Sequence, residues 1–173
     1  MAREDMTIGV VVERRALDNP WVDHVWVPSS ILPDAPAVEP WTVLIDHGHV
    51  RQVYAGAHVI SFFSTDTAHY RDNLASGAPK IWVSLRRRDG EPPVSVVGVT
   101  ADPAEGEAFT EAGDDIVDAV AMPTEIALRL AEFVETHHVE REFVKRRRDR
   151  AAPEVLATKP GGGVYRAGDR NDD

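Results

Sequence analysis

Two histidines separated by one residue are the first candidates for chemistry in this sequence. His47 and His49 follow Asp46 in a short polar turn, and in a strand this spacing points both rings to one side. Imidazole and carboxylate groups bind zinc, iron or manganese, so His58 or His69 could complete a metal site. The spacing fixes no further ligand, and a polar turn explains the same residues. We predict no metal site and keep a small metal-binding enzyme or metal carrier as the alternative function.

The sequence lacks the residues or motifs that several common reaction types require. Cysteine is absent from all 173 residues, which excludes disulfides, thiol nucleophiles and cysteine-ligated metals. No Gly-x-Ser-x-Gly motif places a nucleophilic serine, and no Walker loop or Gly-x-Gly-x-x-Gly motif follows an expected strand. We therefore predict no catalytic residues, no cofactor and no cofactor-binding residues.

A segment that combines arginine with tryptophan is the first candidate for partner binding. Its residues are Arg14, Arg15, Asn19, Trp21, His24 and Trp26. Arginine and tryptophan are enriched among the residues that dominate protein–protein binding energies. The alternative is that the tryptophans are buried and the arginines pair with nearby acidic residues. A second candidate surface contains Tyr70, Arg71 and Asn73 on an expected helix.

The chain is acidic, but one segment is basic. There are 19 Lys and Arg against 29 Asp and Glu, for a net charge of −10. Residues 141–150 nevertheless hold six basic and two acidic residues, including the run Lys145, Arg146, Arg147 and Arg148. This run could bind an acidic partner surface or RNA, or it could fold back on the acidic segment of its own chain or simply be solvated. Because the rest of the chain would repel a polyphosphate, we predict no DNA binding.

The elements that position these residues are mostly short strands. β-branched or alternating segments predict strands over residues 7–14, 21–32, 41–45, 50–63, 80–85 and 93–99. A capped segment predicts one mid-chain helix over 64–75, and an apolar stripe predicts a C-terminal helix from Thr124 to His137. Residues 104–120 are ambiguous between helix and strand. We predict an α+β fold with a mainly antiparallel sheet or a partly closed barrel.

Composition also bounds the organisation of the chain. We expect a single domain over residues 1–150 and a disordered tail over residues 151–173, which are rich in alanine, proline and glycine. No apolar run approaches the roughly 20 residues of a membrane helix, and no secretory signal opens the sequence. The expected location is the cytoplasm, without membrane contact.

The same segments resemble an uncharacterised proteobacterial family, a domain of unknown function. The resemblance rests on Val11–Arg15, Asp18–Trp21 with His24, Trp26 and Pro28, Tyr54–Gly56, Tyr70–Leu74, Trp82–Arg86, Val99–Pro103, Met122–Pro123, Phe133–Val134, His137–His138 and Phe143–Arg146. It covers about residues 6–150.

The resemblance implies an accessory role beside a molybdenum enzyme. Genes of this family accompany molybdenum-dependent formate dehydrogenases, which implies assembly, regulation or docking. Some members carry the label of molybdopterin-guanine dinucleotide biosynthesis proteins, but this chain departs from that activity because it has no Gly-rich nucleotide loop near its start. We therefore expect a non-enzymatic accessory protein that binds formate dehydrogenase subunits or a maturation factor.

Overall fold

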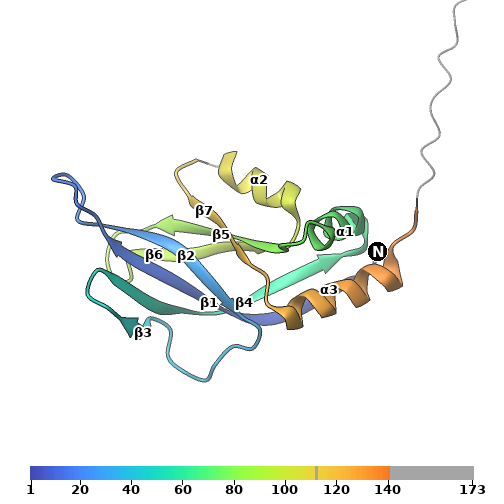
Figure 1. Ribbon diagram of the computed structural model, residues 1–173, viewed down its shortest axis with the longest axis horizontal. Coiled ribbons are helices and arrows are strands. Elements are labelled where there is room, and N and C mark those ends of the chain that lie inside the picture. Colours follow the sequence, from blue (N-terminus) through green and yellow to red (C-terminus); the bar gives the residue numbers. More distant parts are fainter. Residues whose placement is uncertain (112, 141–173) are drawn as a thin grey trace, which may run out of the picture. The chain divides into compact units, whose positions relative to one another are not determined.

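A computed structural model describes residues 1–111 and 113–140 of the chain (Figure 1). Four antiparallel strands form the first sheet, in the order β2-β1-β4-β3. Their bounds are β1 Arg3–Ala16, β2 His24–Leu32, β3 Thr42–Asp46 and β4 Val50–Phe63. β1 pairs with β4 over nearly its whole length and with β2 over its second half. The second half of β1 is therefore the centre of this sheet.

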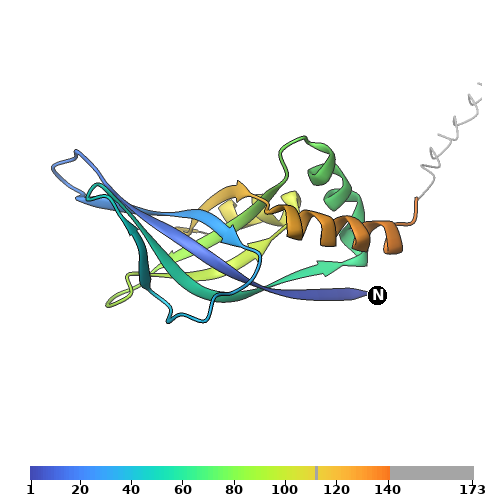
Figure 2. The ribbon, with the colours of Figure 1, turned by 60° about the horizontal axis from the view of Figure 1, so that its bottom comes forward.

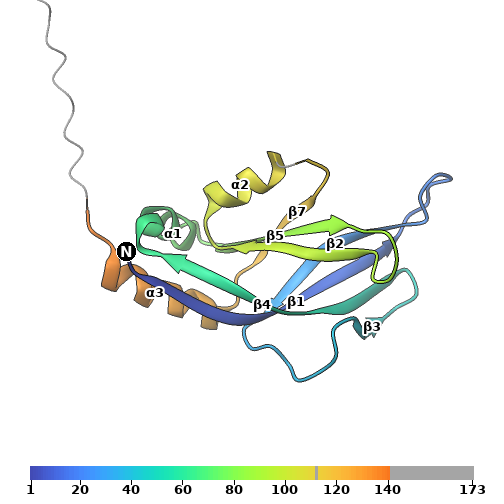
Figure 3. The same cartoon turned by 180° about the vertical axis from the view of Figure 1, so that it is seen from behind.

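The second sheet is smaller, and three helices pack around the two sheets. Its strands are β5 Lys80–Arg87, β6 Val94–Thr100 and β7 Ile116–Ala121, in the antiparallel order β6-β5-β7. The helices are α1 Thr67–Ala75, preceded by a 3-10 turn over Ser64–Asp66, α2 Pro103–Glu111 and α3 Thr124–His137. In Figures 1 and 3, α1 and α3 lie at the end of the sheets away from the β1–β2 hairpin tip.

One apolar core joins both sheets with α1 and α3. Alternate residues of β1, namely Ile8, Val10 and Val12, belong to it together with alternate residues of β5, namely Ile81, Val83 and Leu85. This period of two is the one expected for a strand with one buried face. α3 adds Ile126, Leu130, Phe133 and Val134 to the same core, which confirms the apolar stripe predicted from the sequence.

Part of the second face of the first sheet is covered by the proline-rich segment between β2 and β3. A Cβ atom at Gly9 of β1 would lie 3.3 Å from Pro36 and 3.0 Å from the Tyr54 ring. At Gly56 of β4 it would lie 3.5 Å from Pro40. The close approach explains glycine at position 9, and Gly56 in addition has a φ of 109°, which disfavours any other residue. Tyr54 is buried beneath this segment.

The outer face of the second sheet is covered by α2. A Cβ atom at Gly106 would lie 2.3 Å from Cγ of Trp82 on β5, and one at Gly98 of β6 would lie 2.8 Å from Phe109. Glycine at these two positions lets each ring lie directly against a neighbouring backbone. This packing fixes α2 as a helix although its sequence is ambiguous.

The α+β class and the mainly antiparallel pairing are confirmed. β2 lies beside β7 and β4 lies beside β6, so the strands approach a barrel, but hydrogen bonds join them into two separate sheets and not a closed barrel. The prediction of one mid-chain helix was incomplete, because the ambiguous segment divides into α2 and β7. No helix in the described ranges is long and apolar enough to cross a membrane. Residues 1–140 form one compact unit. The predicted disordered tail and the basic run lie outside the described residues.

Candidate functional site

The core-facing rows of two strands both end in arginine. On β1 the row Ile8, Val10 and Val12 continues to Arg14. On β5 the row Ile81, Val83 and Leu85 continues to Arg87. Both strands end beside the β1–β2 loop (residues 17–23), the β3–β4 turn (47–49) and the β5–β6 loop (88–93); we call this region the hairpin end (Figures 1 and 2). Here the space between the sheets changes from apolar to cationic.

Strand register places a second arginine directly beside the first. Arg14 pairs with Trp26 on β2 and with Arg51 on β4. Arg51 in turn pairs with Asp46 on β3, whose carboxylate lies 3.0 Å from its guanidinium. The hydrogen bond from the Gly48 amide, followed by the charge of Arg51, lowers the pKa of Asp46. The four side chains form one row across the first sheet.

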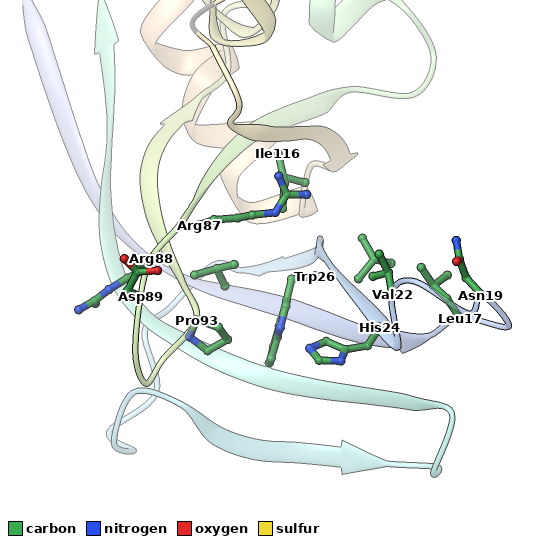
Figure 4. A pocket seen from close by; sticks show the side chains of 12 residues that line it. Leu17, Asn19, Val22, His24, Trp26, Arg87, Arg88, Asp89, Pro93 and Ile116 are labelled. Atoms are coloured by element: carbon green, nitrogen blue, oxygen red, sulfur yellow. The ribbon is translucent and has the colours of Figure 1, made fainter.

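Two adjoining cavities open at the hairpin end and share His24, Trp26 and Pro93. The first has a volume of about 660 Å³, and Figure 4 shows Trp26, His24 and Arg87 around it. The second has a volume of about 580 Å³. The first is lined in addition by Leu17, Asn19, Val22, Val25, Arg87, Arg88, Asp89, Val94 and Ile116, and the second by Arg14, Trp41, Val43, Arg51, Val53, Glu91 and Pro92. Each volume lies in the range of ligand-binding pockets.

Two aromatic rings, Trp26 and His24, line both cavities, and a third, Trp41, lines the second. The Trp26 ring lies 6.1 Å from Trp41 and 6.4 Å from His24, each time edge to face. Trp41 has a φ of 73°, a left-handed conformation that costs an aromatic residue about 1–2 kcal/mol. Among the described residues, no acceptor lies within hydrogen-bonding distance of the buried Nε1 of Trp26. Strained backbone and unpaired buried donors are unusual in a protein interior and concentrate at functional sites.

The tip of the β1–β2 hairpin presents a fully exposed tryptophan. The Trp21 side chain is 89 % exposed, and its neighbour Val22 is 47 % exposed. The Asn19 side chain accepts a hydrogen bond from the Trp21 amide at 2.9 Å, which shapes the loop. The Ala16 amide donates to the His49 carbonyl at 2.8 Å and ties the hairpin to the β3–β4 turn. The loop thus holds Trp21 out from the protein at the hairpin end.

The structure brings most of the first predicted surface together. Arg14, Asn19, His24 and Trp26 line the cavities, and Trp21 stands beside them. Arg15 differs, because its side chain forms an ion pair with the buried Glu13. The bond to Arg15 is the main cause of a lowered pKa of Glu13, ahead of the opposing effect of burial.

The sequence interpretation missed Trp41, Arg51, Arg87 and Arg88 as lining residues. The signal that could have found Arg87 is the extension of an alternating apolar row by a charged residue at a core-facing position. Arg14 and Arg87 share this pattern.

Two residues of the second predicted surface belong to the interior, which corrects the prediction. Tyr70 is 1 % exposed, and its hydroxyl accepts a hydrogen bond from the Phe63 amide at 3.1 Å. Burial raises its pKa to about 12. Asn73 is 5 % exposed and bonds to the backbone of Lys80 and Ala101. These side chains are covered and cannot touch a partner without unfolding.

Arg71 is exposed, but it lies on α1, away from the hairpin end. Its guanidinium lies 3.0 Å from Nε2 of His138 and 3.6 Å from the Glu140 carboxylate. Lys145, Arg146, Arg147 and Arg148 lie outside the described residues. Partner binding by these five residues remains a prediction.

The histidines considered for a metal site do not gather. His47 and His49 are exposed in the β3–β4 turn, while His69 on α1 pairs with Asp102 at 3.0 Å. His58 is half-buried on β4, and burial lowers its pKa. Within residues 1–111 and 113–140, no three histidine or carboxylate residues are arranged to hold a metal ion. The geometry gives the metal alternative no support.

Comparison of the sequence with protein families gives one match. A family described as "Protein of unknown function (DUF3305)" matches residues 7–147. The chain belongs to the DUF3305 family. The DUF3305 match spans all the strands and helices described above except the start of β1. Neither a curated protein nor a solved structure matches this sequence.

Proposed function

We propose that this DUF3305 protein is a non-enzymatic accessory protein that binds a protein partner through its hairpin end. The observation that carries the proposal is Trp21, 89 % exposed beside two aromatic and arginine-lined cavities. A tryptophan so exposed loses a large favourable burial energy, on the order of 2 kcal/mol, which a partner surface would recover. Its neighbours Leu17 and Val22 are also more than 40 % exposed and extend the apolar contact.

The partner we propose is a molybdenum-dependent formate dehydrogenase or a factor of its maturation, in the cytoplasm. The support for this choice is the family resemblance and its gene neighbourhood. The cationic hairpin end adds physical support, because it suits a partner with an acidic contact region. The residues that line the cavities supply aromatic, aliphatic and guanidinium groups, the imidazole of His24, the carboxamide of Asn19 and two carboxylates, Asp89 and Glu91, a set that we assign to partner binding.

Affinity capture from the native host tests the proposal. A tagged full-length chain is expressed in cells grown with molybdate and formate, and the captured proteins are identified by mass spectrometry. We expect formate dehydrogenase subunits or a maturation factor in high yield. Recovery of the chain without a partner would contradict the accessory role.

Matched variants then test the surface. We expect Trp21→Ala to lower partner recovery at least tenfold, in line with the loss of a binding hot spot. The single charge reversal Arg14→Glu should have a similar effect. Leu128→Ala is the control, because Leu128 is 63 % exposed on α3, away from the hairpin end. Full recovery of the partner by both hairpin variants would place the interface elsewhere.

A further inference from the structure

We propose that the two cavities flanking Trp26 together form one site for an extended acidic segment of the protein partner, with carboxylates on Arg14 and Arg87 and an apolar side chain against Trp26. This inference rests on the proposed function and specifies its chemistry. It is carried by the placement of the arginines, by the charge of the rest of the molecule and by the aromatic wall.

The two neighbouring arginines of the first sheet, Arg14 and Arg51, share only one carboxylate partner, Asp46. Arg14 and Arg51 lie directly opposite each other on β1 and β4, an arrangement that destabilises a sheet when both residues carry the same charge. Asp46 pairs with Arg51 and also feels the charge of Arg14, but across the described part of the chain Arg14 itself forms no ion pair. A carboxylate between the two guanidiniums would remove this repulsion and add charge-assisted hydrogen bonds.

The opposite sheet supplies a second cationic contact. Arg87 ends the core-facing row of β5, and Arg88 follows it in the lining of the first cavity (Figure 4). Neither residue forms an ion pair with another described residue, whereas the adjacent Arg86 pairs with Asp115 at 2.9 Å on the outer face. Arg14 and Arg87 therefore offer unpaired guanidiniums from two sheets to the cavities that share Trp26.

The acidic charge of the whole described unit favours a short acidic segment over a long polyanion at this cationic patch. Residues 1–140 hold ten Lys and Arg against 23 Asp and Glu. Four of these ten basic residues line the cavities, where Asp89 and Glu91 are the only acidic lining residues. A long polyanion such as RNA would meet the acidic remainder of the surface. A short segment with a few carboxylates would contact the arginines without reaching the acidic remainder of the surface.

The aromatic wall indicates that the segment also carries apolar side chains. Trp26, Pro93 and Val94 line the first cavity, and Trp41, Val53 and Pro92 the second. Two adjoining cavities that share one tryptophan can take successive side chains of an extended peptide.

Indole NMR signals of the full-length chain test the site directly. The four tryptophans give four Nε1–H signals, assigned with single Trp→Phe variants. The probe is the heptapeptide Gly-Glu-Leu-Glu-Leu-Glu-Gly. We expect it to shift the signals of Trp26 and Trp41. Trp82 is the internal control, because it packs under α2 on the outer face of the second sheet. In every variant that retains Trp82, its unchanged signal also shows that the variant remains folded.

Charge-reversal variants test the role of the arginines. We expect Arg14→Glu and Arg87→Glu each to weaken peptide binding about tenfold. Arg3→Glu is the matched control, because Arg3 is exposed at the opposite end of β1. The peptides with lysine for glutamate, or with serine for leucine, should bind at least tenfold more weakly than the probe.

Several results would overturn the inference. These are no shift of Trp26 at millimolar peptide, equal binding of the lysine peptide, or unchanged affinity in both arginine variants. Tighter binding of single-stranded RNA or inorganic phosphate with the same variant dependence would assign the site to a different ligand class.

Affinity capture with Arg87→Glu and Arg88→Glu separates this inference from the proposed function. Capture of the partner by that variant but not by Trp21→Ala would retain the accessory role and overturn the cavity site. Peptide binding without any captured partner would overturn the accessory role and keep the acidic-peptide chemistry of the cavities.

Discussion

His69 illustrates how a single residue of this chain responds to its neighbour. Its Nδ1 lies 3.0 Å from the Asp102 carboxylate, and this hydrogen bond, opposed in part by burial, raises the pKa of His69. The same carboxylate accepts a hydrogen bond from the Ala104 amide at 2.8 Å at the start of α2. Because the folded state binds the His69 proton more tightly, the pair stabilises the fold fully below about pH 6.5. This contribution is lost as the pH rises through the raised pKa.

The Asp102→Asn variant tests this coupling. We expect the pKa of His69 to fall toward its ordinary value, because the neutral amide no longer favours the imidazolium. An NMR titration of the His69 ring measures the change. His58 is the control, since burial on β4 lowers its pKa independently of Asp102. An unchanged His69 titration would show that the pair does not form in solution.

At the scale of elements, Asn73 joins α1 to the second sheet. Its side-chain amide donates to the Lys80 carbonyl at 2.8 Å and to the Ala101 carbonyl at 2.9 Å, and its carbonyl accepts from the Lys80 amide at 3.0 Å. Asn73→Ala leaves these backbone groups unpaired, and we expect a loss of about 3 kcal/mol in the free energy of unfolding. Urea denaturation measures it. The exposed neighbour Asp72 provides the control, since Asp72→Ala should change stability by no more than about 0.5 kcal/mol. Equal effects of the two variants would refute the role of Asn73.

The close packing of α2 against β5 depends on Gly106, which has no side chain. Gly106→Ala would place a Cβ atom 2.3 Å from the Trp82 ring, so helix and strand must separate. Overpacking of this kind costs typically about 1–3 kcal/mol, although alanine is otherwise the better helix former. Thermal unfolding should show a lower midpoint temperature, and the assigned indole NMR signal of Trp82 should shift. A stability equal to or above that of the wild type would mean that helix propensity outweighs this contact.

At the scale of the whole molecule, the excess of acidic residues disfavours nucleic acids as binding partners. Ten basic residues against 23 acidic residues over residues 1–140 give a surface that repels a duplex. We expect the full-length chain to show no binding of double-stranded DNA at about 0.15 M salt. Fluorescence anisotropy with a labelled duplex measures this. Salt-sensitive binding in the micromolar range would contradict the expectation.

Much of the secondary structure follows from local patterns. The alternation in β1 and β5, the polar turn at residues 46–49 and the apolar stripe of α3 each depend on neighbouring residues, and all are found in the structure. The split of residues 104–120 does not follow in this way. Helix and strand patterns overlap there, and the contact between Gly106 and Trp82 decides between them.

For the candidate site, the sequence by itself determined that arginine and tryptophan lie close together on the first hairpin, because residues of one hairpin are neighbours whatever the rest of the fold. Only the tertiary structure decided that Arg51 lies opposite Arg14 and that Arg87 joins them from another sheet. It also decided that Tyr70 and Asn73 are buried. Strand register and sheet packing join residues distant in the chain. A charged residue at a core-facing position lines a cavity only where the opposite sheet no longer covers it.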